Sequence, residues 1–262
     1  MKTLKVDNLN LSYMDIGSGP PLILIHGMAS DHNVWSGIIP LLQENFRVIA
    51  VDLRGHGGSS KTPGPYSMEL FSTDIEGLLE SLDILKARFI GHSLGGAVTQ
   101  KIAIKNPDMV SSLTLISSFA YQDFQLKKSL INLRNILNES GFNEFFEECL
   151  KLAYNPRYVK ENRELLNQFR EDMSKTSSVI SLIATINACL KVNNLDSLKN
   201  IVAPTLVIAG REDRFISIDQ GIIINKNIPH SQLEIIPGAS HNVLVEEPHK
   251  VYDIMKTFLI EY

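Results

Sequence analysis

Residues Arg88 to Val98 read RFIGHSLGGAV, and they form the most informative segment of this 262-residue chain. The first four have the apolar content of a short strand, and the residues after Ser93 begin a helical pattern that ends at Asn106-Pro107. A serine between a strand and a helix, flanked by Gly91 and Gly95, is typical of a very tight turn that leaves no room for side chains at the two glycines. The serine oxygen then stands clear of the sheet, at the positive end of the following helix.

The Gly-x-Ser-x-Gly spacing alone is weak evidence. Glycine and serine are each near 7% of ordinary sequences, so roughly one chain in ten carries the pattern by chance. An ordinary glycine turn is therefore the competing interpretation. The strand before Gly91 and the helix after Ser93 supply the context that a nucleophilic serine requires. We expect Ser93 to be a nucleophile.

Strand-like and helix-like segments alternate on both sides of this turn. Continuous apolar runs suit strands that are buried on both faces of a parallel sheet. Segments between the runs, such as 71–82 and 251–259, have apolar residues at helical spacing. The alternation predicts an α/β fold with a mostly parallel, doubly wound sheet, preceded by an antiparallel hairpin that turns near Asp7-Asn8. The six predicted sheet strands are 21–26 (PLILIH), 47–52 (RVIAVD), 88–91 (RFIG), 113–117 (LTLIS), 204–210 (PTLVIAG) and 232–237 (QLEIIP).

The alternation is interrupted between residues 119 and 198, where no strand-like run occurs. Gly141 and Pro156 divide this segment into roughly four helical pieces. We interpret it as a helical lid that is inserted between two strands and covers one edge of the sheet. The core of the fold is then expected in two parts, residues 1–118 and 199–262.

Composition limits the possible partners. Hydrophobic residues make up 44% and charged residues 21% of the chain, which suits one elaborated domain with a sizeable core. The net charge of −4 offers no surplus of cations for phosphates, so nucleic acid is not an expected partner. The first residues lack the apolar run of a signal peptide, and no stretch is apolar enough to span a bilayer. We expect a cytoplasmic protein without a membrane partner; its oligomeric state is left open.

No sequence signature of a metal or cofactor is present. Cys149 and Cys189 are 40 residues apart and have no neighbouring Cys or His at metal-ligand spacing, so buried free thiols are expected. The chain lacks His-Glu-x-x-His and any phosphate-binding Gly-x-Gly-x-x-Gly after a strand. We therefore predict no cofactor and no metal.

Several short motifs, in this order along the chain, resemble the α/β-hydrolase superfamily. The resemblance covers nearly the whole chain outside the predicted lid, and it is strongest to lidded esterases and 3-oxoadipate enol-lactonase-like hydrolases. It implies the α/β-hydrolase fold, and it implies that the loop 52–59 is a structural turn. The matching residues are His26-Gly27, Trp35, 52–59 (DLRGHGGS), Gly91–Gly95, Gly210–Asp213 and His241.

A serine needs a base, almost always histidine, to accept its proton. His241 follows the last predicted strand and precedes the C-terminal helix, which matches the order serine, acid, histidine of this fold. His92 adjoins the serine, and its side chain is expected to point elsewhere. The other five histidines are expected in loops or at helix starts, with the last three of them solvated: His26, His56, His32, His230 and His249.

The remaining site residues are those that the resemblance implies. Asp213, at the end of the strand between nucleophile and base, is the expected acid, with Glu212 a near rival and Asp219 a distant one. The tetrahedral intermediate needs backbone N–H donors where its negative charge develops. Leu94 and Met28 are expected to supply these donors from their main chains.

These residues predict a serine esterase that acts on a small-molecule acyl substrate through an acyl-enzyme. Nine aromatic residues in the lid favour carboxylic esters with small to medium apolar acyl groups. Alternatives are an enol-lactonase, a thioesterase, a C–C bond hydrolase of the same fold, or a hydrolase-like receptor for a small apolar ligand. C–C hydrolases usually place a tryptophan just after the catalytic histidine, whereas Asn242 follows His241 here.

Overall fold

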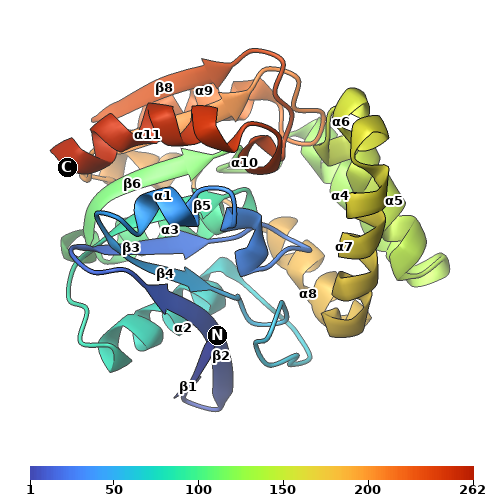
Figure 1. Ribbon diagram of the computed structural model, residues 1–262, viewed down its shortest axis with the longest axis horizontal. Helices are drawn as coiled ribbons and strands as arrows, with labels where there is room; N and C mark the ends of the chain where they lie inside the picture. Colours follow the sequence, from blue (N-terminus) through green and yellow to red (C-terminus); the bar gives the residue numbers. More distant parts are fainter.

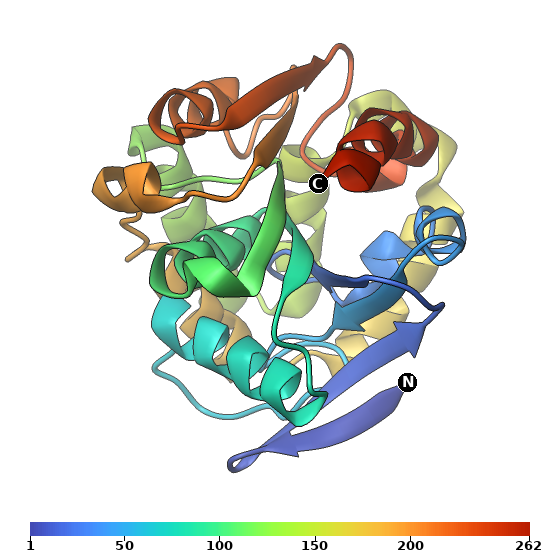
Figure 2. The same cartoon turned by 90° about the vertical axis from the view of Figure 1, so that its left-hand side faces the viewer.

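A twisted sheet of eight strands runs through the computed structural model, which describes residues 1–262 (Figure 1). The strand order is β1-β2-β4-β3-β5-β6-β7-β8; β2 is antiparallel to both neighbours, and all other pairs from β4 to β8 are parallel. The hairpin and β8 lie at opposite edges (Figure 2). The strands are β1 (Lys2–Val6), β2 (Leu9–Ile16), β3 (Pro21–Ile25), β4 (Arg47–Val51), β5 (Ala87–His92), β6 (Val110–Ile116), β7 (Thr205–Gly210) and β8 (Ser231–Ile236).

This topology confirms the predicted α/β-hydrolase fold with its mostly parallel sheet. Each of the six predicted sheet strands is present, and the ends differ from the prediction by at most three residues, the largest difference being the earlier start of β6 at Val110. The hairpin turns at Asp7-Asn8, where Asp7 has a positive φ of 50°.

Helices cover both faces of the sheet because successive strand residues point to opposite sides. Ile23 and Ile25 of β3 join the cluster that packs under α2, α3 and α9. Leu22 and Leu24 join the cluster under α1 and α11. Burying each such side chain stabilises the fold by about 1.5–3 kcal/mol. The helices of this core are α1 (Ile39–Leu42), α2 (Met68–Ser81), α3 (Leu94–Lys105), α9 (Ile218–Asn227), α10 (Val243–Glu246) and α11 (Pro248–Glu261), with 3-10 turns η1 (His32–Trp35), η2 (Pro107–Met109) and η3 (Leu195–Asn200).

The segment between β6 and η3 contains five helices rather than the roughly four expected. Gly141 and Pro156 begin two of them, as predicted, but a further boundary at Asn162 has neither glycine nor proline to mark it. We call α4–α8 the helical insertion; it lies beyond the carboxyl ends of the strands (Figure 1). Its helices are α4 (Phe124–Glu139), α5 (Phe142–Ala153), α6 (Pro156–Glu161), α7 (Arg163–Thr176) and α8 (Val179–Cys189). No helix in the protein has the length and apolarity to cross a membrane.

The loop 52–59 is a hydrogen-bonded turn that holds the segment after β3 in place. The buried Asp52 carboxylate accepts from the Gly58 N–H at 2.8 Å and from the His32 N–H at 2.8 Å. Gly57 has a φ of 46°, and a side chain there would overlap the Asp52 carboxylate. His32 begins η1, so its expected place at a helix start is confirmed. The expectation that it is solvated is wrong, because its ring is half-buried and bonds Asp52, which raises the pKa of His32.

Candidate active site

The turn at Ser93 has a strained backbone, as its sequence predicts. Ser93 has φ 53° and ψ −117°, outside the regions that ordinary side chains favour, and it is the residue before α3. A Cβ on Gly91 would lie 2.5 Å from the Gly95 carbonyl oxygen, and one on Gly95 would overlap the Ile25 carbonyl. Only glycine fits at either position, so the two glycines allow α3 to start directly against β3 and β5.

Three predicted residues from three different loops lie in hydrogen-bonding contact. His241 Nε2 is 3.0 Å from Ser93 Oγ, and His241 Nδ1 is 2.8 Å from Asp213 Oδ2. The other oxygen of Asp213 accepts the main-chain N–H groups of Phe215 at 2.9 Å and Ile216 at 2.8 Å. The carboxylate is therefore fixed at both oxygens and can orient the histidine ring.

This arrangement selects one tautomer of His241. A carboxylate accepts only, so Nδ1 carries the proton, and the lone pair of Nε2 faces the Ser93 hydroxyl. Ser93 and His241 are 3% and 4% exposed, and the Phe215 ring stands edge-on to the imidazole at 5.1 Å. Low water access strengthens the two hydrogen bonds. The rival acids Glu212 and Asp219 are exposed and bond neither residue.

Two main-chain amides beside Ser93 have no partner within the protein. Leu94 opens α3, where the first N–H groups of a helix lack carbonyl acceptors, and its amide donates to nothing. The Met28 amide, in the loop after β3, is likewise free, and Met28 lines the same cavity as Ser93. Both amides are available to a negative charge that develops next to the serine oxygen.

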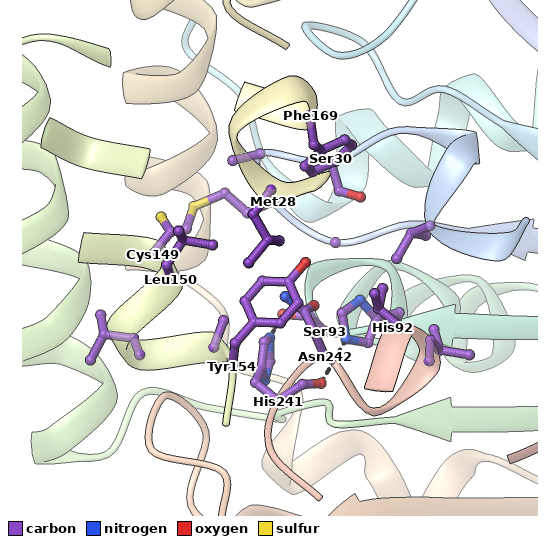
Figure 3. A pocket seen from close by; sticks show the side chains of 18 of the residues that line it. Met28, Ser30, His92, Ser93, Cys149, Leu150, Tyr154, Phe169, His241 and Asn242 are labelled. Atoms are coloured by element: carbon purple, nitrogen blue, oxygen red, sulfur yellow. Dashed lines mark hydrogen bonds between the residues drawn. The ribbon is translucent and has the colours of Figure 1, made fainter. Parts of the chain in front are cut away.

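His92 does not bond Ser93, as expected, but its ring lies against the site rather than away from it. Its Nε2–H donates to the main-chain oxygen of His241 at 3.1 Å, and the two rings are 5.1 Å apart (Figure 3). Burial lowers the pKa of His92 to about 3, so the ring is neutral. His92 is the last residue of β5, and its ring reaches the cavity wall beside the loop that carries His241. The contact joins residues 149 positions apart, which residue spacing alone could not reveal.

A cavity of about 390 Å³ opens above Ser93, between the sheet and the helical insertion. Eighteen of the 28 lining residues are hydrophobic, and none is Lys, Arg, Asp or Glu. Figure 3 shows Ser93, His241, Asn242 and Tyr154 close together, with Cys149 and Leu150 farther along the wall.

The nine aromatic residues of the predicted lid segment divide into two groups. Five line the cavity: Phe145, Phe146, Tyr154, Tyr158 and Phe169. Phe119 is buried elsewhere, Phe124 is 84% exposed, Tyr121 bridges to Asn193, and Phe142 packs beside Phe145 and Phe146. Sequence reasoning did not single out Asn242 or Leu150 for the wall. The only signal was the position of Asn242 directly after His241.

Other reactive side chains are held in neutral forms. Burial lowers the pKa of His56 to about 3, raises that of Cys189 to about 12 and raises that of Cys149. His26 donates to the Gly27 carbonyl and accepts from the Leu53 N–H, so both of its nitrogens are engaged. No group of three or more His, Cys, Asp and Glu side chains is arranged to hold a metal ion.

Comparison with known proteins agrees with the fold. Residues 20–248 match the family model described as alpha/beta hydrolase fold. The chain is 29% identical to 3-oxoadipate enol-lactonase 2 of Acinetobacter baylyi, over 98% of this chain and 97% of that protein. A hydrolase from Pseudomonas aeruginosa superposes with a TM-score of 0.91 at 28% identity, covering 98% and 97% of the two chains. An esterase from Thermogutta terrifontis superposes with a TM-score of 0.87 at 26% identity, covering 99% and 96%.

Proposed function

This chain belongs to the α/β-hydrolase family, and we propose that it is a serine hydrolase that cleaves carboxylic esters through an acyl-enzyme on Ser93. The observation that carries the proposal is the pair of hydrogen bonds that join Ser93 to His241 and His241 to Asp213, at 3.0 and 2.8 Å. A serine, a base and an orienting carboxylate at these distances are the parts that acyl transfer requires.

The proposed reaction has two halves that use the same groups. Ser93 Oγ attacks the carbonyl carbon while His241 Nε2 takes the hydroxyl proton, and the carbonyl oxygen becomes an oxyanion near the free amides of Met28 and Leu94. Collapse of this intermediate breaks the ester C–O bond, and His241 returns the proton to the departing alcohol. Water then attacks the acyl-enzyme with Nε2 as base, releasing the acid and the Ser93 hydroxyl.

The cavity supports a substrate with small to medium apolar acyl groups. Its volume of about 390 Å³ lies near the lower end of the roughly 300–1,000 Å³ of small-molecule sites. Aliphatic and aromatic side chains form most of the wall. Each methylene that enters such a wall contributes about 0.8 kcal/mol, or up to about fourfold in kcat/KM.

An enol-lactone is the alternative that the Acinetobacter baylyi relative suggests. A lactone of 3-oxoadipate carries a carboxylate, and burying an unpaired carboxylate is costly unless a cation or several donors receive it. The cavity lining has no Lys or Arg. This absence of a cation supports uncharged esters over an anionic lactone. Thioesters and C–C bonds, and a receptor role without turnover, have no specific observation in their favour.

The test is a series of nitrophenyl esters from acetate to decanoate, measured beside one anionic enol-lactone. We expect kcat/KM to rise with chain length until the cavity is full and to exceed that for the lactone. The Ser93→Ala variant is the control, and its kcat is expected to be lower by on the order of 10³-fold. A lactone preference above tenfold would replace the ester proposal, and no turnover of any substrate would favour the receptor.

A further inference from the structure

The loop that carries His241 is joined to the helical insertion at one place. Asn242 N–H donates to the Ala153 carbonyl at 2.9 Å, and Ser240 Oγ lies 3.0 Å from the same carbonyl. Ala153 is the last residue of α5, and Ser240 and Asn242 are the two neighbours of His241. The main chain on both sides of the proposed base therefore contacts the end of one insertion helix.

The carboxylate of Glu246, in α10, lies at the centre of this joint. Its Oε2 accepts from Ser240 N–H at 3.0 Å, and its Oε1 lies 2.5 Å from Ser240 Oγ and 2.6 Å from the Asn155 N. All three partners donate to the carboxylate. Two are main-chain N–H groups; the third, Ser240 Oγ, has one proton and gives it to the carboxylate, which is closer than the Ala153 carbonyl at 3.0 Å. No lysine or arginine pairs with Glu246.

The joint fixes two groups of the cavity at once. His241 is held between Ser240 and Asn242, while Tyr154 is held between Ala153 and Asn155. Tyr154 is 8% exposed, stacks on Tyr158 and faces the cavity beside Ser93 and His241 (Figure 3). A second link, from Asn155 Nδ2 to the Gly238 carbonyl at 3.3 Å, connects the same two segments.

We propose that Glu246 is a positioning residue that holds His241 in register with Ser93 by tying the loop 238–242 to the end of α5. The inference rests on the proposed function, since it assigns Glu246 a task in that reaction without contact to the substrate. A displacement of about 1 Å in a reacting group can cost on the order of 10²-fold in rate. Three donors facing one carboxylate provide such a constraint, and they require both oxygens as acceptors.

The test compares Glu246→Gln and Glu246→Ala with Glu247→Gln, which makes the same kind of change at the next, exposed residue. Turnover of nitrophenyl acetate is measured because this short ester has little acyl chain to touch the insertion. Glutamine keeps one acceptor oxygen and presents an amide to the third donor, so we expect kcat to fall about tenfold. Alanine removes all three bonds, and kcat is expected to fall on the order of 10²-fold. KM should change less than twofold in either variant, and Glu247→Gln should match the wild type.

A double-mutant cycle separates positioning from general loss of stability. Ser240→Ala removes one of the same bonds, so Ser240→Ala combined with Glu246→Ala should lower kcat no further than Glu246→Ala alone. Thermal unfolding confirms that each variant is folded. If Glu246→Ala does not fold, Glu246→Gln takes its place in the cycle with Ser240→Ala. The inference is overturned if the folded variants keep kcat within twofold, if only KM changes, or if Glu247→Gln loses as much. Ester turnover by Ser93→Ala within a few-fold of wild type would instead overturn the proposed function.

Discussion

The wall of the cavity formed by the sheet carries its side chains on strand ends and short loops, whereas the wall formed by the insertion carries most of them on the helices α4 to α7. On the sheet side, hydrogen bonds fix Ser93, His241 and Asp213 individually. On the insertion side, Phe146 and Leu150 are placed by packing within a small separate cluster. In the proposed reaction, the sheet wall supplies the chemistry and the insertion wall supplies the shape of the site.

The largest expected effect comes from breaking the sheet wall at its acid. Asp213→Asn puts an amide where the carboxylate receives Nδ1–H, so His241 loses the tautomer that can accept the serine proton. We expect kcat for esters to fall on the order of 10³–10⁴-fold with the fold retained. Asp219→Asn, at an exposed residue of α9, is the matched control and should remain within a few-fold of wild type. An Asp213→Asn variant with more than a tenth of wild-type kcat would contradict this division of roles.

A smaller effect concerns the dependence of the free energy of unfolding on pH. All seven histidines lie outside the insertion, so their contribution comes from the core of the fold. Burial lowers the pKa of His56 and of His92 to about 3, so below about pH 6.5 both residues take up protons only on unfolding. Their contribution to stability is complete above about pH 6.5 and is lost as pH falls towards 3. The raised pKa of His32 acts in the opposite direction: its stabilisation is present below about pH 6.5 and lost as pH rises above it.

Each of the two neutral histidines should lower the free energy of unfolding by up to about 1.4 kcal/mol per pH unit in this range. Urea unfolding at pH 7.5, 6.5 and 5.5 measures the sum, in which His32 offsets part of the loss. His56→Asn and His92→Asn should each show a shallower dependence than wild type. Equal free energies at the three pH values, in wild type and variants alike, would show that these rings are not held neutral.

The smallest effect is expected from the insertion wall. Phe169 of α7 lines the cavity beside Phe146, so Phe169→Ala should create room for longer acyl chains. The optimum of the ester series should move to longer chains, with a gain of up to about fourfold per added methylene and little change for acetate. Phe124→Ala, at an exposed residue of the same insertion, should leave the optimum unchanged. If Phe169→Ala instead loses acetate turnover by as much as it gains for longer esters, the two walls do not act separately.

The sheet wall was the more predictable of the two. The turn at Gly91, Ser93 and Gly95 could be predicted because it admits few residue types. The apolar strands could be predicted because a strand buried on both faces needs a continuous apolar run. The contacts of His92 and His32 were not predictable, since their partners, the His241 carbonyl and the Asp52 carboxylate, come from other loops of the chain. The joint at Glu246 joins segments about 90 residues apart in the sequence, and no local pattern marks it.

The helix boundaries and the cavity-facing rings of the insertion could not be predicted from local sequence either. Helical spacing continues across Asn162, so the boundary between α6 and α7 has no sequence signal. Aromatic residues predicted an apolar wall but could not show which rings face the cavity. Phe124 and Phe146 are both phenylalanines of the insertion, yet Phe124 is 84% exposed and Phe146 only 7%.

The most direct test of the central claim is covalent labelling by a fluorophosphonate, which mimics the tetrahedral intermediate and forms a stable bond to an activated serine. We predict one phosphonyl group per chain, located by mass spectrometry on Ser93, with ester turnover lost in proportion to labelling. Ser93→Ala should take up no label. Full ester turnover in a chain labelled at Ser93, or complete inactivation with the label on another residue, would contradict the account.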